Sequence, residues 1–282
     1  MDVKTVDYTA PDAQHSLAES LRETGFAVLV NHPISAPRID EAYARWAEFF
    51  ASDDKMDWLR DPQNQDGFFP FLSENAKGAA AKDLKEFYHV YSWGRVPDSL
   101  SDMTRKLYSD LVTLGQKLLG WLDNETPEDV RSKMTAPLST MMDKSEQSLF
   151  RILHYPPLSD TAESAAEDST AIRAAAHEDI NLITLLLAGS KPGLEAQDIE
   201  GNWHNVPCDP GMITINNGDM LSLATNGFYP STTHRVVNPE RTQNSARYSM
   251  PMFLHPRPDV ALTQGFTADM FLQQRLREIG LK

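Results

Sequence analysis

The amino-acid sequence predicts a mainly β fold, a double-sheet barrel or jelly roll, with flanking helices before and after it. From about Ser148 the chain consists of short β-rich runs separated by turn residues. The first 145 residues instead carry helical periodicity, and a helical pattern returns over Ala268–Ile279. With 282 residues, 41% of them hydrophobic, the chain can bury the large core that such a fold requires.

The first part of the chain is predicted to combine helices with a short strand. Leu17 and Leu21 lie four residues apart, on one face of a helix that Gly25 can end. The segment IDEAYARWAEFF likewise repeats apolar residues at the spacing of one helix face. The predicted elements are a helix over Ser16–Thr24, a strand over Phe26–Val30, and helices over Ile39–Phe50 and Leu100–Leu122.

The β region is divided by turn signals such as DPG, NNGD and NPER. Gly201–Asn202 lies between two runs and predicts a hairpin. Ser159–Thr170 is small and acidic, and we expect a mobile surface loop there. The β-rich runs are SLFRILHYP, INLITLLLA, GLEAQD, NWHNVP, MITINN, SLATN, THRVVN and RYSMPMFLHP.

Composition narrows the class of protein. The net charge is −14 and no block of Lys or Arg is present, which argues against a nucleic acid as partner and suits a protein that handles small molecules. Cys208 is the single cysteine, so no internal disulfide can form and a reducing compartment fits. The sequence shows no signal-peptide pattern and no apolar run near the roughly 18 residues of a membrane span. We therefore expect a cytoplasmic protein.

A candidate metal site begins with His177 and Asp179. Alternate residues of a strand point to the same side, so this imidazole and carboxylate should project together. His234 in the segment STTHRVVNP can supply a third ligand. Two histidines and one carboxylate leave positions open on a metal, as in the non-haem iron(II) oxygenases. Catalytic zinc accepts the same ligands, and an isolated His-x-Asp pair is often structural.

Arg247 and Ser249 form a second pair, two residues apart in ARYSMPMFLHP. A guanidinium binds a carboxylate through two parallel hydrogen bonds, and a neighbouring hydroxyl adds another donor. An arginine that points into a barrel requires an anion. The pair therefore indicates a carboxylate receptor, although an internal acidic side chain could also satisfy Arg247.

Taken together, these motifs resemble the isopenicillin N synthase-like iron(II)/2-oxoglutarate-dependent dioxygenase family. The order His-x-Asp, distal His, Arg-x-Ser is similar to that family, as are the segments ETGFAVLVNHPIS and GLEAQDIEGNWHNVPCDPGMITINNGDML. The resemblance covers residues 5 to 258, nearly the whole chain. It implies a distorted double-stranded β-helix (jelly-roll) core over residues 146–258, an amino-terminal helical and mixed region over 1–120, and a carboxyl-terminal helix over 266–282.

The resemblance also implies a function and a set of site residues. It implies that His177, Asp179 and His234 bind Fe(II) as the catalytic metal, and that Arg247 and Ser249 receive the far carboxylate of 2-oxoglutarate. Tyr155 in LHYPP matches a tyrosine that helps to bind this co-substrate in relatives; many plant members have Asn two residues before it, where this chain has Leu153. With O2, such an enzyme oxidises a small organic substrate and releases succinate and CO2.

Two other interpretations are open from the sequence. The first is an iron oxidase of the isopenicillin N synthase type that does not use 2-oxoglutarate, because such enzymes share the Arg-x-Ser pair. The second is a binding or sensor module that keeps the barrel without the chemistry. Uncoupled succinate formation from 2-oxoglutarate would separate the first from a dioxygenase, and an intact ligand set argues against the second.

Several residues outside these motifs carry weaker predictions. The aromatic segments 64–78 and 82–95 can line a substrate pocket or pack helices against the barrel, and a short strand is predicted over Phe87–Tyr91. Asp219 and Arg235 are candidates for a supporting ion pair. His154 is expected to be structural and to face away from Tyr155, whereas His204, His255 and His32 are expected at turn or surface positions.

Overall fold

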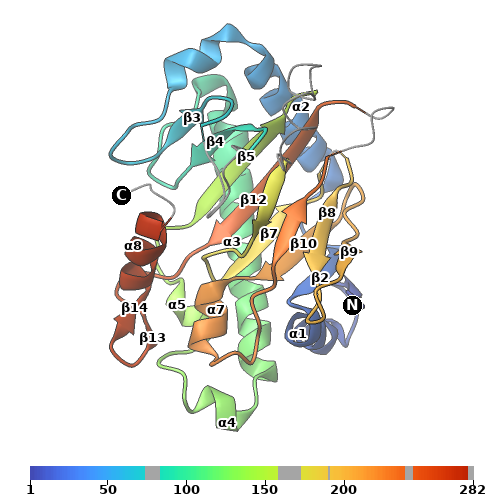
Figure 1. The fold of residues 1–282 in the computed structure, drawn as a ribbon, viewed down its shortest axis with the longest axis vertical. Coiled ribbons are helices and arrows are strands. Elements are labelled where there is room, and N and C mark those ends of the chain that lie inside the picture. Colours follow the sequence, from blue (N-terminus) through green and yellow to red (C-terminus); the bar gives the residue numbers. More distant parts are fainter. Residues whose placement is uncertain (74–82, 158–172, 190, 239–243, 279–282) are drawn as a thin grey trace.

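The computed structural model describes residues 1–73, 83–157, 173–189, 191–238 and 244–278 (Figure 1). The predicted loop over Ser159–Thr170 lies outside these residues. The helices are α1 (Ala13–Thr24), α2 (Ala36–Ala51), the 3-10 helix η1 (Asp53–Trp58), α3 (Asp98–Glu125), α4 (Glu128–Arg131), α5 (Leu138–Met141), α7 (Asp219–Ala224) and α8 (Ala268–Glu278). None of the helices in the described ranges is both long and apolar enough to cross a membrane.

The strands form one large sheet, one smaller sheet and a hairpin. The large sheet, in spatial order, contains β1 (Thr5–Asp7), β2 (Phe26–Val30), β10 (Ile213–Asn217), β7 (Ile183–Leu187), β12 (Arg247–Leu254), β5 (Leu149–Tyr155), β4 (Glu86–Val90) and β3 (Gly67–Phe69). The smaller sheet contains β6 (Ala174–His177), β11 (His234–Val236), β8 (Leu194–Gln197) and β9 (Trp203–Asn205). The hairpin pairs β13 (Ala261–Thr263) with β14 (Phe266–Thr267).

The two faces of the large sheet have different neighbours. Its outer face packs against the helices, with α3 running behind the strands (Figure 1). Its inner face packs against the smaller sheet, since Phe26, Val28 and Leu186 share an apolar cluster with residues of β6, β8 and β11. All five residues of β7 are buried because both of its faces are covered. The arrangement is the predicted jelly-roll core with flanking helices.

Most predicted elements are confirmed. The helix that was expected over Ser16–Thr24 begins earlier, at Ala13, and ends at Gly25, whose φ of 74° is the left-handed value that glycine adopts most easily. The strand over Phe26–Val30 has the predicted bounds. Helices α2, α3 and α8 cover the predicted helical segments as far as the structure describes them. Every predicted β run except SLATN contains a strand, and β8 pairs with β9 as the predicted hairpin.

The segment SLATN is a correction, because it lies in and just after helix α7 and not in a strand. Gly218 precedes this helix in an extended conformation, and Met220, Leu221 and Ala224 are its buried residues. That spacing matches one face of a helix, which turns three apolar side chains into the core. A run of five residues is too short for its own periodicity to distinguish the two structures.

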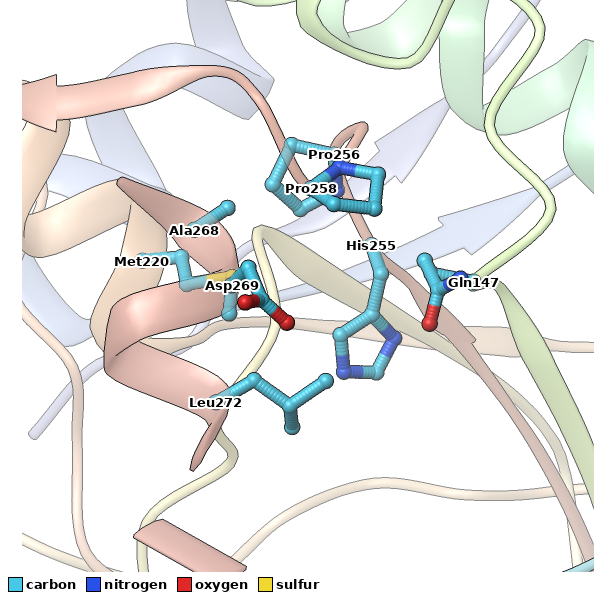
Figure 2. Close-up of a pocket in the computed structure, with 8 residues that line it drawn as sticks. All are labelled: Gln147, Met220, His255, Pro256, Pro258, Ala268, Asp269 and Leu272. Carbon is cyan, nitrogen blue, oxygen red and sulfur yellow. The ribbon is translucent and has the colours of Figure 1, made fainter. Parts of the chain in front are cut away.

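His255 follows β12 and lines a small cavity beside α8 (Figure 2). The cavity volume is about 10 Å³, room for about one water molecule and too little for an organic substrate. Burial lowers the pKa of His255 to about 4. His255 is half-buried just after β12, and the first turns of α8 lie beside it.

We predict that the metal-free protein loses stability as the pH falls from neutral toward 4. The imidazole of His255 takes up a proton near pH 6.5 in the unfolded chain, since that is its ordinary pKa. In the folded protein it does so only at about 4. Between these two pH values, protons bind preferentially to the unfolded state. The folded state therefore loses stability as the pH falls. Urea unfolding midpoints across this range test the prediction. His255→Gln should flatten the profile, and an unchanged slope in that variant would contradict it.

Candidate metal centre

His177 and His234 face each other across two neighbouring strands. His177 is the last residue of β6, His234 is the first residue of β11, and the two are register partners in the smaller sheet. Asp179 lies beyond the end of β6, in the connection to β7. The prediction that His177 and Asp179 share a strand is therefore wrong. The turn after β6, rather than strand alternation, brings the carboxylate beside the imidazoles.

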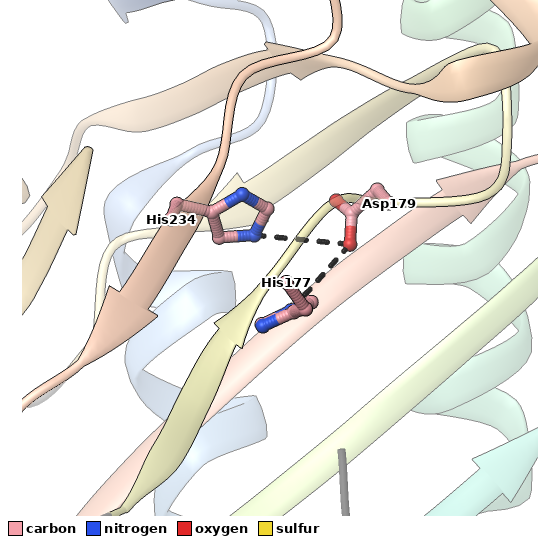
Figure 3. Close-up of side chains that lie close together, drawn as sticks. All are labelled: His177, Asp179 and His234. Atoms are coloured by element: carbon pink, nitrogen blue, oxygen red, sulfur yellow. Dashed lines mark ion pairs between the residues drawn. The ribbon is translucent and has the colours of Figure 1, made fainter. Parts of the chain in front are cut away.

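The three side chains converge on one point (Figure 3). Asp179 Oδ1 lies 3.8 Å from His177 Nε2 and 3.8 Å from His234 Nε2. One ligand atom from each residue lies within 4.8 Å of the others, and no other such cluster of three His, Cys, Asp or Glu occurs in the described ranges. These atoms are close enough to hold one divalent ion, and the set of two nitrogens and one oxygen suits iron(II) or zinc.

Backbone carbonyls fix the orientation of both imidazoles. His177 Nδ1 lies 2.7 Å from the carbonyl oxygen of Ala175, and His234 Nδ1 lies 3.1 Å from that of Thr232. A carbonyl accepts a hydrogen bond only, so each Nδ1 must carry the proton. Each Nε2 then presents its lone pair toward Asp179, which is the tautomer that binds a metal.

The second oxygen of Asp179 is held by two buried side chains that the sequence analysis missed. Thr184 Oγ1 donates to Asp179 Oδ2 at 2.5 Å, and Asn216 Nδ2 donates to the same atom at 2.7 Å. The backbone N–H of Asp219 donates to the Asp179 carbonyl at 2.7 Å. The sequence signal was weak: Thr184 is the single polar residue of LITLLL, and Asn216 is one of three polar residues in MITINN.

Electrostatics at the cluster favour the protonation states that bind a metal. Burial, followed by the neighbouring His234, lowers the pKa of His177 to about 4. Burial alone would raise the pKa of Asp179, but His234, His177 and the hydrogen bonds from Thr184 and Asn216 together lower it. At neutral pH, His177 is therefore neutral and Asp179 is charged. The residues present fit a divalent metal.

Arg247 and Ser249 point to the inner side of the large sheet, as predicted from their spacing. They are buried, and their register partners on β5 are Tyr155 and Leu153. The guanidinium carbon of Arg247 lies 5.3 Å from the centre of the Tyr155 ring. Arg247 Nε donates to the carbonyl oxygen of Lys191 at 3.1 Å, whereas Nη1 is buried and has no hydrogen-bond partner among the described residues. That buried, unsatisfied donor fits an anionic ligand.

The expected ion pair between Asp219 and Arg235 is not formed. Arg235 Nε instead donates to Glu195 Oε2 at 2.7 Å, and its guanidinium lies 3.9 Å from the centre of the Trp203 ring. Arg235 follows His234 on β11, so strand alternation turns it away from the metal ligands and toward the neighbouring strands. Asp219 is the first residue of α7, where its backbone rather than its side chain supports Asp179.

The other histidines have structural partners. His154 stacks on Tyr248 with 4.6 Å between ring centres, on the opposite side of the sheet from Tyr155, as the sequence predicts. His154 Nδ1 also lies 2.7 Å from Glu86 Oε1. His204 contacts Asp198 beside the β8–β9 hairpin, and His32 contacts the Gly211 carbonyl.

The predicted aromatic segments divide between the two faces of β3 and β4. Phe68 and Tyr88 face the helices and join the main core, where Tyr88 packs 5.1 Å from the Trp46 ring. The adjacent Phe69 and Phe87 face inward and stack on each other with 4.5 Å between ring centres. The prediction that these rings pack helices against the barrel is thus correct for Phe68 and Tyr88. The inner half forms a separate buried cluster of Phe69, Phe87, Leu153 and Tyr155.

Comparisons with known proteins agree with this geometry. The family described as the 2OG-Fe(II) oxygenase superfamily matches residues 146–256, and the family described as non-haem dioxygenase in morphine synthesis N-terminal matches residues 2–108. A Shewanella oneidensis crystal structure classed as an oxygenase is 46% identical over 100% of both chains, with a TM-score of 0.89. A 2-oxoglutarate-dependent dioxygenase of Monascus ruber is 28% identical over 277 residues, which cover 89% of this chain and 82% of that protein.

A more distant likeness supports the fold alone. A full-length Neurospora crassa protein, crystallised with alpha-KG and thymine, is 20% identical and superimposes with a TM-score of 0.80 over 98% of this chain and 96% of its own. A jelly roll with two imidazoles and one carboxylate at one end of its smaller sheet is a framework that non-haem iron oxygenases use.

A Caulobacter crescentus crystal structure of a 2OG-Fe(II) oxygenase family protein is 33% identical over 98% of this chain and 99% of its own, with a TM-score of 0.80. The chain therefore belongs to the 2OG-Fe(II) oxygenase superfamily. It is an oxidoreductase, a dioxygenase whose metal is iron(II) and whose co-substrate is 2-oxoglutarate. The predicted resemblance is confirmed at the level of this superfamily.

We predict that Thr184→Val weakens iron(II) binding about tenfold, because loss of a hydrogen bond that orients a metal ligand has an effect of roughly 10- to 100-fold. Valine keeps the shape of threonine and removes the donor to Asp179, together with an acceptor for Asn181 Nδ2. Thr214→Val is a matched control, since Thr214 is also buried on the inner face but donates to the Pro207 carbonyl. Anaerobic titration with iron(II) measures both variants. Equal affinities would show that Thr184 does not orient Asp179.

Proposed function

We propose that His177, Asp179 and His234 are the protein ligands of the catalytic iron(II). The observation that carries the proposal is the position of Asp179 Oδ1, 3.8 Å from the Nε2 atoms of both histidines. Hydrogen bonds occupy the other atoms of each ligand, namely Asp179 Oδ2 and the two Nδ1 nitrogens. One oxygen and two nitrogens are thus left free to bind the metal.

We also propose that Arg247, Ser249 and Tyr155 receive 2-oxoglutarate. Arg247 and Ser249 supply hydrogen-bond donors for the carboxylate far from the metal, and Tyr155 lies on the neighbouring strand beside Arg247. The bound iron and 2-oxoglutarate supply the oxidising chemistry, in which one O2 oxidises the co-substrate to succinate and CO2 and adds oxygen to a small organic substrate. The chain's own residues hold these groups in place and exclude water.

The buried cluster of Phe69, Phe87, Leu153 and Tyr155 keeps water away from the proposed co-substrate site. Phe87 is fully buried, and Phe69 and Leu153 are nearly so, which places apolar side chains beside Tyr155. Leu153 occupies the position where many plant relatives have Asn, so this part of the surface offers no polar contact to the co-substrate. A dry surface strengthens the electrostatic contacts of Arg247 and protects the reaction from side reactions.

The substrate class and the setting follow as finer proposals. We propose a small organic substrate, because the net charge of −14 does not suit a nucleic acid. A single cysteine among 282 residues fits a reducing, cytoplasmic setting. Within the superfamily, the order of the motifs favours the isopenicillin N synthase-like branch.

Asp179→Ala tests the metal ligands. We expect iron(II) affinity to fall at least about 100-fold, because the variant removes the single anionic ligand and leaves Thr184 and Asn216 without an acceptor. Glu178→Ala is the matched control, since Glu178 is the exposed neighbouring acid. Isothermal titration under nitrogen measures both. Wild-type affinity in Asp179→Ala would overturn the assignment of the ligands.

Gly189→Ala and Arg247→Lys test the co-substrate site. A β-carbon at position 189 would lie 3.0 Å from Arg247 Nη2 and 3.2 Å from the Tyr248 carbonyl, so it would displace the guanidinium. We expect 2-oxoglutarate affinity to fall about tenfold in each variant, the equivalent of one charged hydrogen bond, with iron affinity unchanged.

Gly120→Ala is the control for the glycine variant, because a β-carbon at position 120 would lie 4.0 Å from Ser139 Cβ and displace nothing. Succinate formation without added substrate is the second measurement for the wild-type protein. If Arg247→Lys and Gly189→Ala bind 2-oxoglutarate as tightly as the wild-type protein, the proposed co-substrate site is wrong.

A further inference from the structure

A second arginine, Arg173, is buried as deeply as Arg247. Each is 1% exposed, and both are among the largest fully buried side chains in the described part of the chain. Arg173 immediately precedes β6, the strand that ends in His177. The sequence analysis did not single it out, because IRAAAH shows no motif that separates this arginine from a surface residue.

The two guanidinium groups gather around the same aromatic ring. The guanidinium carbon of Arg173 lies 5.8 Å from the centre of the Tyr155 ring, and that of Arg247 lies 5.3 Å from it. Arg173 Nη2 donates to the carbonyl oxygen of Ser245 at 2.7 Å, two residues before Arg247. Burial, followed by the charge of Arg247, lowers the pKa of Arg173 to about 10. The arginines therefore repel each other in the absence of an anion.

Neither arginine has an acidic partner among the residues that the structure describes. The buried Nε of Arg173 and the buried Nη1 of Arg247 have no hydrogen-bond partner within the described ranges. Lys85, a third buried cation, shows the usual arrangement, with Nζ 2.8 Å from Asp83 Oδ2. Two unpaired cations in a protein interior are unfavourable unless a ligand brings negative charge to them.

The position of Arg173 identifies the ligand. Arg173 lies one residue before β6, and the pairing of β6 with β11 is irregular between Ala174 and His177, so the position of Arg173 follows from its contacts and not from strand alternation. Its backbone N–H donates to Asn238 Oδ1 at 2.9 Å, and its side chain contacts the Tyr155 ring and the Ser245 carbonyl. An anion bound near the Arg247 guanidinium therefore has Arg173 on the side of β6 and Arg247 on the side of β12.

We propose that Arg173 is a second guanidinium for the far carboxylate of 2-oxoglutarate, and that it sets the preference of the site for a dicarboxylate. The inference rests on the proposed co-substrate site. Arg247 and Ser249 bind this carboxylate from β12, and Arg173 adds a donor and a positive charge from the strand of the metal ligand. Arg173 is thus a specificity-determining residue for the co-substrate.

The test compares two keto acids on the iron(II)-loaded protein under nitrogen. The first is 2-oxoglutarate, and the second is 2-oxopentanoate, which has the same carbon chain without the far carboxylate. We expect Arg173→Gln to weaken 2-oxoglutarate binding about tenfold to 100-fold, and Arg173→Lys to weaken it less. Binding of 2-oxopentanoate should be unchanged in both variants. Arg235→Gln is the matched control, because that arginine pairs with Glu195, and both keto acids should bind as in the wild type.

Thermal unfolding separates this role from a merely structural one. The two roles predict opposite changes in the melting temperature of the ligand-free Arg173→Gln variant. Without metal or keto acid, Arg173→Gln should melt at or above the wild-type temperature, because it removes a buried cation that has no partner. The rise in melting temperature on addition of iron(II) and 2-oxoglutarate should shrink. If Arg173 had only a structural role, Arg173→Gln would instead lower the melting temperature both with and without these ligands.

The outcomes separate the inference from the proposed function. If the wild-type protein binds 2-oxoglutarate and Arg173→Gln binds it equally well, the inference is wrong and the proposed function stands. An equal loss for both keto acids in that variant would likewise overturn the inference, since the far carboxylate would not be involved. If the wild-type protein binds iron and no keto acid, both the proposed co-substrate site and the inference fail.

Discussion

The Asp179 carboxylate is the point on which the rest of the site depends. Its Oδ2 atom accepts hydrogen bonds from Thr184 on β7 and Asn216 on β10, so the large sheet holds it. Its Oδ1 atom faces His177 and His234, which belong to the smaller sheet. One side chain therefore ties the two sheets of the jelly roll together. A metal bound by all three side chains would join the sheets a second time.

The inner face of the large sheet is polar at the site and apolar around it. Alternation along β7, β10 and β12 turns Leu185, Ile215 and Met252 toward the helices, where they form the main core. The residues between them face the smaller sheet, and Thr184, Asn216 and Ser249 are among these. The same alternation on β3 and β4 separates Phe69 and Phe87 from Phe68 and Tyr88. A single period of two thus builds the helix-packed core and the lining of the site at once.

Charge within this interior is unbalanced in one place. Asp179 is balanced by its hydrogen bonds and by the imidazoles, and Lys85 is balanced by Asp83. Arg173 and Arg247 have no such balance in the described residues, and they share one aromatic neighbour, Tyr155. A dianionic co-substrate supplies the charge that this region lacks. The interior is therefore organised for a ligand in addition to its own stability.

The sequence by itself determined the family and most of the order of helices and strands, and it supplied the residues proposed here to bind the metal and the co-substrate. Spacing was sufficient for Arg247 and Ser249, because two residues on one strand necessarily share a face. It was insufficient for Asp179, which follows its strand and reaches the metal site through a turn. Thr184, Asn216 and Arg173 were recognisable only in the tertiary structure. Their importance depends on which distant side chain each one meets inside the barrel, and contacts between strands far apart in the chain leave no local pattern in the sequence.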